Sequence, residues 1–190
     1  MTLNHLRPLA TLALTLSAPL YAADNPSAHQ HGHAELQLAI SGDRADLFFT
    51  SPAHNLLGFE HEARTDEQKQ HVHSVREWLA TTPLISTGDI DCQITDANVD
   101  IEAMEHRGRH DEDDHNHEYD DHDQTEQQSH SDIEVTQVLN CPGIDSTKAL
   151  ITALPEQFTA ISQLEISWVS SSGQGSARLK DGETTFSLAP

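Results

Sequence analysis

Residues 34–50 decide the fold, and they read AELQLAI, SGD and RADLFFT in succession. Apolar and polar residues alternate over 34–40 and again over 44–50, which is typical of strands that bury one face. The SGD between them is rich in turn-forming residues, so the whole stretch predicts a β-hairpin. A hairpin with one apolar face needs further strands or a helix to cover that face.

Outward from the hairpin, the clearest element is a helix over residues 66–80. Asp66 can cap its start, and Val72, Val75 and Leu79 fall on one face. Further strands are predicted over 90–101, 133–139, 164–169, 176–180 and 184–188, with one or two short helices over 146–158, broken at Pro155. This pattern predicts an α+β fold: a single domain with an antiparallel sheet, one main helix and a disordered His- and acid-rich insert.

The N-terminus has the features of a secretory signal peptide over residues 1–22. Arg7 precedes an apolar run over 9–16, and Ala22-Ala23 supplies small residues for cleavage. A membrane anchor is the alternative, but the apolar run is short for a bilayer span. We expect residues 23–190 to form a single exported metal-binding domain without membrane insertion.

Composition narrows the class of ligand. The chain carries 31 Asp plus Glu against 10 Lys plus Arg, a formal net charge of −21. Nucleic acids and anionic membrane surfaces require a basic footprint, so both are excluded as partners. Its 14 histidines lie among many carboxylates, a combination that suits divalent transition metals.

The most unusual segment is residues 105–132, which hold 6 His, 11 Asp or Glu and only 2 Arg. With almost nothing to bury, this segment should be disordered without a ligand. A solvated acidic loop is the plain interpretation. We favour a flexible loop that gathers zinc, because imidazole and carboxylate are zinc ligands. Its candidate ligands are His106, His110, His115, His117, His122, His130 and Asp132.

A second histidine cluster, His29, His31 and His33, follows the signal peptide. In extended chain, side chains two residues apart point to the same side, so the three imidazoles could converge. His33 and Glu35 open one predicted strand, and His130 and Asp132 open another. If those strands are neighbours, the four side chains could form a rigid zinc site; otherwise they are polar residues on an outward face.

Four other histidines are weaker candidates. His71 and His73 are two apart on the predicted helix and cannot chelate one ion, so at most one contributes, and we favour His71. His61, like His54, flanks a loop, where it is a metal ligand or a structural histidine.

The two cysteines, Cys92 and Cys141, each end a strand-like run. An even count in an exported protein favours a disulfide between them. Two thiolate metal ligands are the alternative, although such ligands normally have closer spacing.

Enzyme motifs are absent from the sequence. There is no HExxH, GxSxG, P-loop or GxGxxG, and the acidic segment does not fit an EF-hand frame, which ranks calcium below zinc. A zinc metallohydrolase with scattered ligands remains a third possibility. We expect the protein not to be an enzyme.

One combination of motifs resembles a known family. The run from His31 to Leu36, Ser51-Pro52-Ala53, and Leu57-Gly58-Phe59-Glu60-His61 are similar to the ZrgA family, as are Ser172-Gly173-Gln174-Gly175, the cysteine pair and the central insert. The resemblance covers the mature chain. It implies a zinc-binding protein of the Gram-negative periplasm that is made under zinc limitation and assists a zinc ABC transporter.

Together these observations predict a periplasmic accessory protein that captures Zn(II) and supports high-affinity uptake. Its partner would be the periplasmic binding protein or the permease of the transporter. The alternative is a periplasmic buffer or storage protein for zinc, copper or nickel with no dedicated transporter partner.

Overall fold

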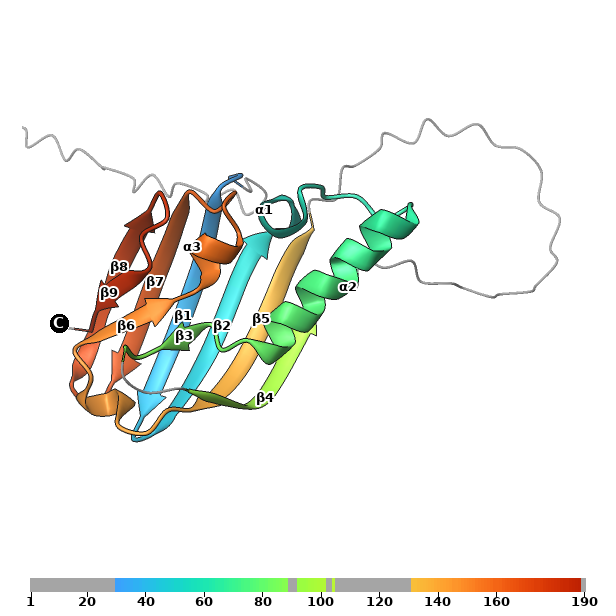
Figure 1. The fold of residues 1–190 in the computed structure, drawn as a ribbon. Coiled ribbons are helices and arrows are strands. Elements are labelled where there is room, and N and C mark those ends of the chain that lie inside the picture. Colours follow the sequence, from blue (N-terminus) through green and yellow to red (C-terminus); the bar gives the residue numbers. More distant parts are fainter. Residues whose placement is uncertain (1–29, 89–91, 102–103, 105–130, 189–190) are drawn as a thin grey trace, which may run out of the picture.

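The computed structural model describes residues 30–88, 92–101, 104 and 131–188 (Figure 1). The predicted signal peptide, His29 and residues 105–130 lie outside the described residues. The described helices and strands run in the order β1 (His33–Ser41), β2 (Arg44–Pro52), α1 (Ala53–Leu57), α2 (Asp66–Thr81), β3 (Ile85–Ser86), β4 (Gln93–Asp100), β5 (Asp132–Asn140), the 3₁₀ turn η2 (Ile144–Ser146), β6 (Ala149–Thr152), α3 (Leu154–Gln157), β7 (Gln163–Ser170), β8 (Gly173–Lys180) and β9 (Thr185–Ser187).

Two sheets organise the chain. A six-stranded sheet has the order β4-β5-β2-β1-β7-β8, and a small sheet has the order β3-β6-β9. All pairs in the large sheet are antiparallel except β1 with β7, which run parallel. The α+β class and the single domain are confirmed, with a mixed sheet in place of a fully antiparallel one.

The large sheet has one covered face. Helix α2, α3 and the small sheet lie on the same side of it (Figure 1). Alternate residues of the strands point into this layer and form the core, including Leu36, Phe49, Ile133 and Ile166, each at most 1% exposed. We call this the inner face. The opposite side, the outer face, carries the polar half of the same alternation.

The predicted hairpin is confirmed as β1 and β2, which pair from Glu35–Thr50 to Ser41–Arg44. Helix α2 is confirmed as the main helix, and Val72, Val75 and Leu79 are its buried residues. Its cap differs from the prediction. Thr65, not Asp66, is the N-cap, because Thr65 and Gln68 form a reciprocal capping box.

The region 146–158 also differs from the prediction. Residues 149–152 form strand β6, and only Leu154–Gln157 is an α-helix. Pro155 does not break this helix; it occupies the first turn, where its missing N–H has no intrahelical acceptor to lose.

The disulfide between Cys92 and Cys141 is confirmed, with Cα atoms 4.3 Å apart. Cys141 is buried directly after β5, and Cys92 directly precedes β4, the neighbouring strand. The bridge therefore ties the edge strand to the core at one end of the sheet.

Candidate metal site

Three histidines of the described chain, His31, His33 and His54, lie at the end of the sheet where β1 begins. Here Gly32 has φ +82° and its carbonyl accepts hydrogen bonds from the backbone N–H groups of Ser162 and Gln163. The left-handed backbone favours glycine at this position, and a Cβ here would also force the Ser162 hydroxyl to rotate away.

Asn55 fixes this turn from the other side. Its side chain is 3% exposed and accepts from Gly32 N–H at 2.8 Å. Its Nδ2 donates to the His33 carbonyl at 2.9 Å and to Ser51 Oγ at 3.1 Å. The backbone on both sides of Gly32 is therefore held before any metal binds.

The turn separates His31 from His33. Because Gly32 adopts a left-handed conformation, the chain is not extended here, and the two imidazoles have different partners. The predicted convergence of the three N-terminal histidines is not found for His31 and His33.

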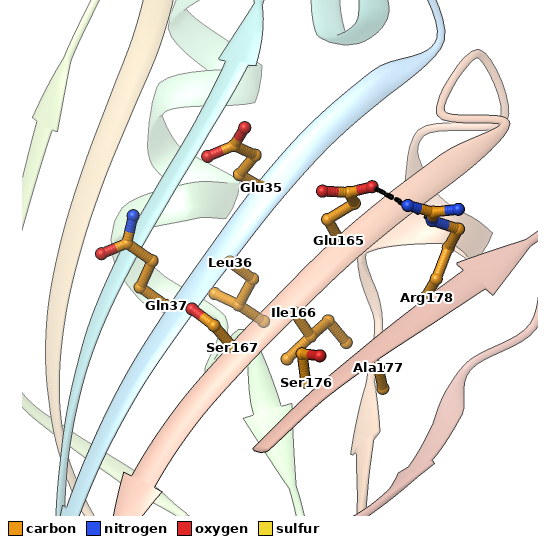
Figure 2. Close-up of a pocket in the computed structure, with 9 residues that line it drawn as sticks. All are labelled: Glu35, Leu36, Gln37, Glu165, Ile166, Ser167, Ser176, Ala177 and Arg178. Atoms are coloured by element: carbon orange, nitrogen blue, oxygen red, sulfur yellow. Dashed lines mark hydrogen bonds and ion pairs between the residues drawn. The ribbon is translucent and has the colours of Figure 1, made fainter. Parts of the chain in front are cut away.

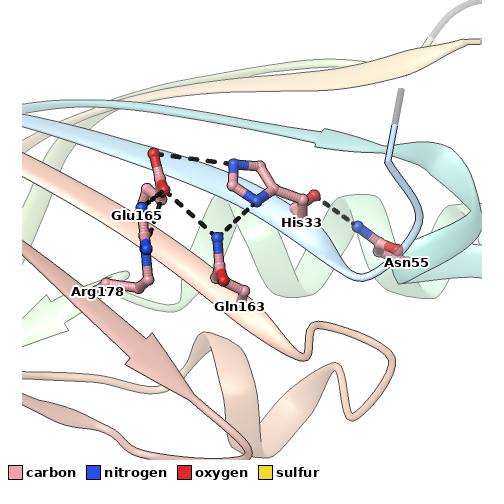
Figure 3. A network of polar contacts seen from close by, with 5 residues as sticks. All are labelled: His33, Asn55, Gln163, Glu165 and Arg178. Atoms are coloured by element: carbon pink, nitrogen blue, oxygen red, sulfur yellow. Dashed lines mark hydrogen bonds and ion pairs between the residues drawn. The ribbon is translucent and has the colours of Figure 1, made fainter. Parts of the chain in front are cut away.

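His33 belongs to the outer face of the sheet (Figure 3). Gln163 Nε2 donates to His33 Nδ1 at 3.1 Å, and His33 Nε2 lies 4.0 Å from Glu165 Oε2. Arg178 in turn donates from Nε to Glu165 Oε1 at 3.0 Å. This network orients the imidazole ring and leaves one carboxylate oxygen facing it.

A row of polar side chains crosses the outer face at the next position along the strands. Glu134, Thr50, Glu35, Glu165 and Arg178 are successive register partners on five strands. Glu35, Glu165 and Arg178 line a shallow trough of about 360 Å³, to which the small side chains of Ser167 and Ser176 also contribute. Figure 2 shows these side chains. Three carboxylates against one guanidinium make this row favourable to cations.

The predicted sheet-face site of His33, Glu35, His130 and Asp132 rests on a wrong assumption about the strands. Strands β1 and β5 are not neighbours, because β2 pairs with both. His33, Glu35 and Asp132 nevertheless line one hollow of about 110 Å³ that spans Pro52 and Thr50 of β2. His130 lies outside the described residues.

His31 has its own partners, which differ from those of His33. Its Nε2 lies 2.9 Å from Glu60 Oε1, and its ring stacks on that of His54 with centroids 4.4 Å apart. His61 is nearby in sequence but faces elsewhere: its Nδ1–H donates to the Glu62 carbonyl at 2.8 Å, and Phe59 stacks on its ring.

One further predicted ligand lies among the described residues. His71 is exposed on α2. The predicted ligands that lie outside the described residues are His29, His106, His110, His115, His117, His122 and His130. Within the described parts of the chain, no group of three or more ligand-type side chains is already arranged to hold a metal ion.

Sequence reasoning missed two residues of these clusters, Glu60 and Glu165, and gave His54 only as a loop histidine that is a metal ligand or a structural residue. Glu165 is brought to His33 by the parallel pairing of β1 with β7, which no local pattern indicates. A signal for Glu60 existed in its position beside His61 in a loop rich in ligand types.

A comparison with known protein families shows that the chain belongs to a class of zinc uptake proteins. The sequence model of the ZrgA family, described as a zinc uptake protein family, matches residues 28–188. The chain therefore belongs to the ZrgA family, and the resemblance seen in the sequence is confirmed. A comparison with curated proteins gave no match. Among the described residues, none of the helices combines the length and apolarity of a membrane span.

Proposed function

We propose that this protein is a non-enzymatic, periplasmic accessory protein that captures Zn(II) and supplies it to a high-affinity import system. Membership of a zinc uptake family supports the choice of metal. The observation that carries the proposal is the hollow of about 110 Å³ lined by His33, Glu35 and Asp132. One imidazole and two carboxylates suit zinc, and because these side chains are not yet arranged around one point, they must rotate to converge on an ion.

The network around His33 permits metal binding at Nε2 once the side-chain amide of Gln163 is reversed. In the present arrangement Gln163 donates to Nδ1, so the proton of a neutral ring is on Nε2. Reversal of the Gln163 amide would let Nδ1–H donate to its oxygen and would leave Nε2 free to bind zinc. Glu165, with Oε2 4.0 Å from the ring, is an additional ligand on the β7 side.

The attachment of the His-rich segment supports a two-stage capture. Its two flanking residues are both anchored to the fold: the Ser131 carbonyl accepts from Ala53 N–H, and the Met104 carbonyl accepts from Ala63 N–H. Ala53 and Ala63 bracket His54, Glu60 and His61 in sequence. The segment, with its six histidines, would bind zinc loosely and pass it to the sheet-face site by exchange of one ligand at a time.

Zinc release should depend on pH. Imidazole binds zinc only in its neutral form, so affinity should fall as pH decreases through about 6.5. Unchanged affinity between about pH 7.5 and 5.5 would exclude histidine ligands.

The test is calorimetric titration with Zn²⁺ of the chain from residue 23, beside a variant in which a Gly/Ser linker replaces residues 105–130. Met104 and Ser131 are retained because their carbonyls belong to the fold. We expect the weaker sites to disappear and tight binding to remain, and His33→Ala to weaken the tight binding. His73→Ala, exposed on α2, is the matched control.

Each outcome has a meaning. Loss of all binding in the linker variant would remove the sheet-face site, and absence of binding in the unaltered chain would overturn the zinc function. In cells, the linker variant should grow poorly on scarce zinc. Sensitivity to excess metal alone would instead indicate a buffer or storage protein.

A further inference from the structure

Two ligand-type side chains, His54 and Glu60, each contact the imidazole of His31 beside the Gly32 turn. His31 lies in the turn before β1, His54 in the first turn of α1, and Glu60 in the loop after it. His31 Nε2 is 2.9 Å from Glu60 Oε1, and the His31 and His54 rings are nearly parallel, at 14°, with centroids 4.4 Å apart.

The backbone around this cluster is fixed by groups that do not themselves bind metal. The buried amide of Asn55 accepts from Gly32 N–H and therefore ties the turn of His31 to the helix of His54. The turn and the helix cannot drift apart without breaking this bond, which lies next to both imidazoles in sequence.

A chain reversal after α1 brings the Glu60 carboxylate to His31. Gly58 has φ +80° and its N–H donates to the His54 carbonyl at 2.9 Å, which ends α1. This reversal places Glu60 against His31. The Glu60 side chain is 20% exposed and that of His31 is 56% exposed, so the carboxylate is the more sheltered partner.

Two imidazoles and one carboxylate form a common three-residue zinc ligand set, which leaves a fourth position open. Donor atoms on one tetrahedral zinc ion lie about 3.3 Å apart, given bonds of about 2.0–2.1 Å. The 2.9 Å between His31 Nε2 and Glu60 Oε1 is close to that separation. Zinc would replace the proton that the two atoms now share.

The third ligand requires a rotation. Since no described group is already arranged to hold an ion, His54 must turn out of its stack on His31 to direct a nitrogen at the same point. His54 is only half-buried, so this rotation does not have to take place inside the core.

We propose that His31, His54 and Glu60 form a second zinc site on the folded domain, distinct from the sheet-face hollow, with three protein ligands and one exchangeable position. This inference rests on the proposed zinc function. The open position would let an incoming ligand bind before a protein ligand leaves, as transfer between proteins requires.

The test compares His54→Ala and Glu60→Gln with His73→Ala in the full chain from residue 23, titrated with Zn²⁺ against a competing chelator. We expect both cluster variants to bind one zinc ion fewer, or one ion about tenfold or more weaker, and His73→Ala to match the unaltered chain. Glu60→Gln keeps the side-chain shape, and thermal melting checks that each variant folds.

The outcomes separate the two proposals. If the unaltered chain binds zinc and the cluster variants bind it as His73→Ala does, the second site is wrong and the zinc function stands. If the unaltered chain binds no zinc, both proposals fail. Imidazole ¹⁵N shifts of His31 and His54 that do not move as zinc is added would also overturn the site.

Discussion

The two faces of the six-stranded sheet differ in what their residues do, although they alternate along the same strands. Leu36 on β1 is fully buried on the inner face, whereas its neighbour Glu35 lines both hollows on the outer face. The same parity separates Ile166 from Glu165 on β7. Along each of these strands, the inward residues stabilise the fold and the outward residues are the candidate metal ligands. A substitution on one face should therefore leave the role of the other face unchanged.

The inner face contains one instructive polar side chain, Gln137 of β5, which is 1% exposed. Its oxygen accepts from Leu84 N–H at 3.0 Å, and its Nε2 donates to the carbonyls of Leu79 and Thr82 at 2.7 and 2.9 Å. All of its hydrogen-bonding groups are used, and they join the sheet to the end of α2.

The largest effect should come from removing the disulfide. Cys92 and Cys141 are 49 residues apart, so Cys92→Ser with Cys141→Ser should lower the free energy of unfolding by about 3–4 kcal/mol. Urea denaturation measures it. Zinc affinity at the other end of the sheet should change little in the population that stays folded. If zinc affinity fell by a comparable free energy, stability and metal binding would not be separable in this fold.

The next largest change in stability is expected at Gln137 of β5, in comparison with its neighbour Thr136. Gln137→Ala leaves a buried N–H and two carbonyls without their partner and should cost about 2–3 kcal/mol. Thr136→Ala, on the outer face, should cost less than about 0.5 kcal/mol. Denaturant titration of the two variants decides. Similar values would show that the outer face contributes to stability as well.

A smaller effect is expected at the start of α2, which covers the inner face. Thr65→Ala removes the capping box and should cost about 1 kcal/mol. Thr81→Ala is the matched control at the other end of the helix, where its hydroxyl only donates to the Glu77 carbonyl. Thermal unfolding should show a lower midpoint for Thr65→Ala than for Thr81→Ala; the reverse order would remove the role of the cap.

The smallest effect concerns an exposed pair on β2. A hydrogen bond from Arg44 lowers the pKa of Asp46, so any stability from the pair is present above the ordinary pKa of aspartate and is lost as pH falls through the lowered value. Arg44→Ala should raise the Asp46 pKa, measured by NMR titration, with little change in stability. Arg178→Ala should leave the pKa of Asp46 unchanged. A change in that pKa would indicate a long-range electrostatic effect across the outer face.

Much of the fold could be predicted because its signals are local. The alternation over 34–50 predicted the hairpin, and the spacing of Val72, Val75 and Leu79 predicted α2. The order of strands could not be predicted in the same way. The pairing of β2 with β5, and of β1 with β7, joins segments far apart in sequence, and alternation indicates a strand without naming its partner.

The candidate sites show the same limit. His33, Glu35 and Asp132 were selected from their spacing on predicted strands, and they do line one hollow. His54 and Glu60 reach His31 only because Asn55 fixes one turn and Gly58 reverses the chain, which are tertiary and conformational facts. Residue type identifies candidate ligands, whereas backbone geometry decides which of them meet.

The parallel pairing of β1 with β7 affects the order in which the protein folds. His33 and Gln163 are 130 residues apart, and contacts between such distant segments form slowly because the chain must first close a long loop. The β1–β2 hairpin is local and can form early. The surroundings of His33 are complete only when β7 joins the sheet, so during folding its hairpin exists before its binding environment does, and competence for metal should appear among the last properties the chain acquires.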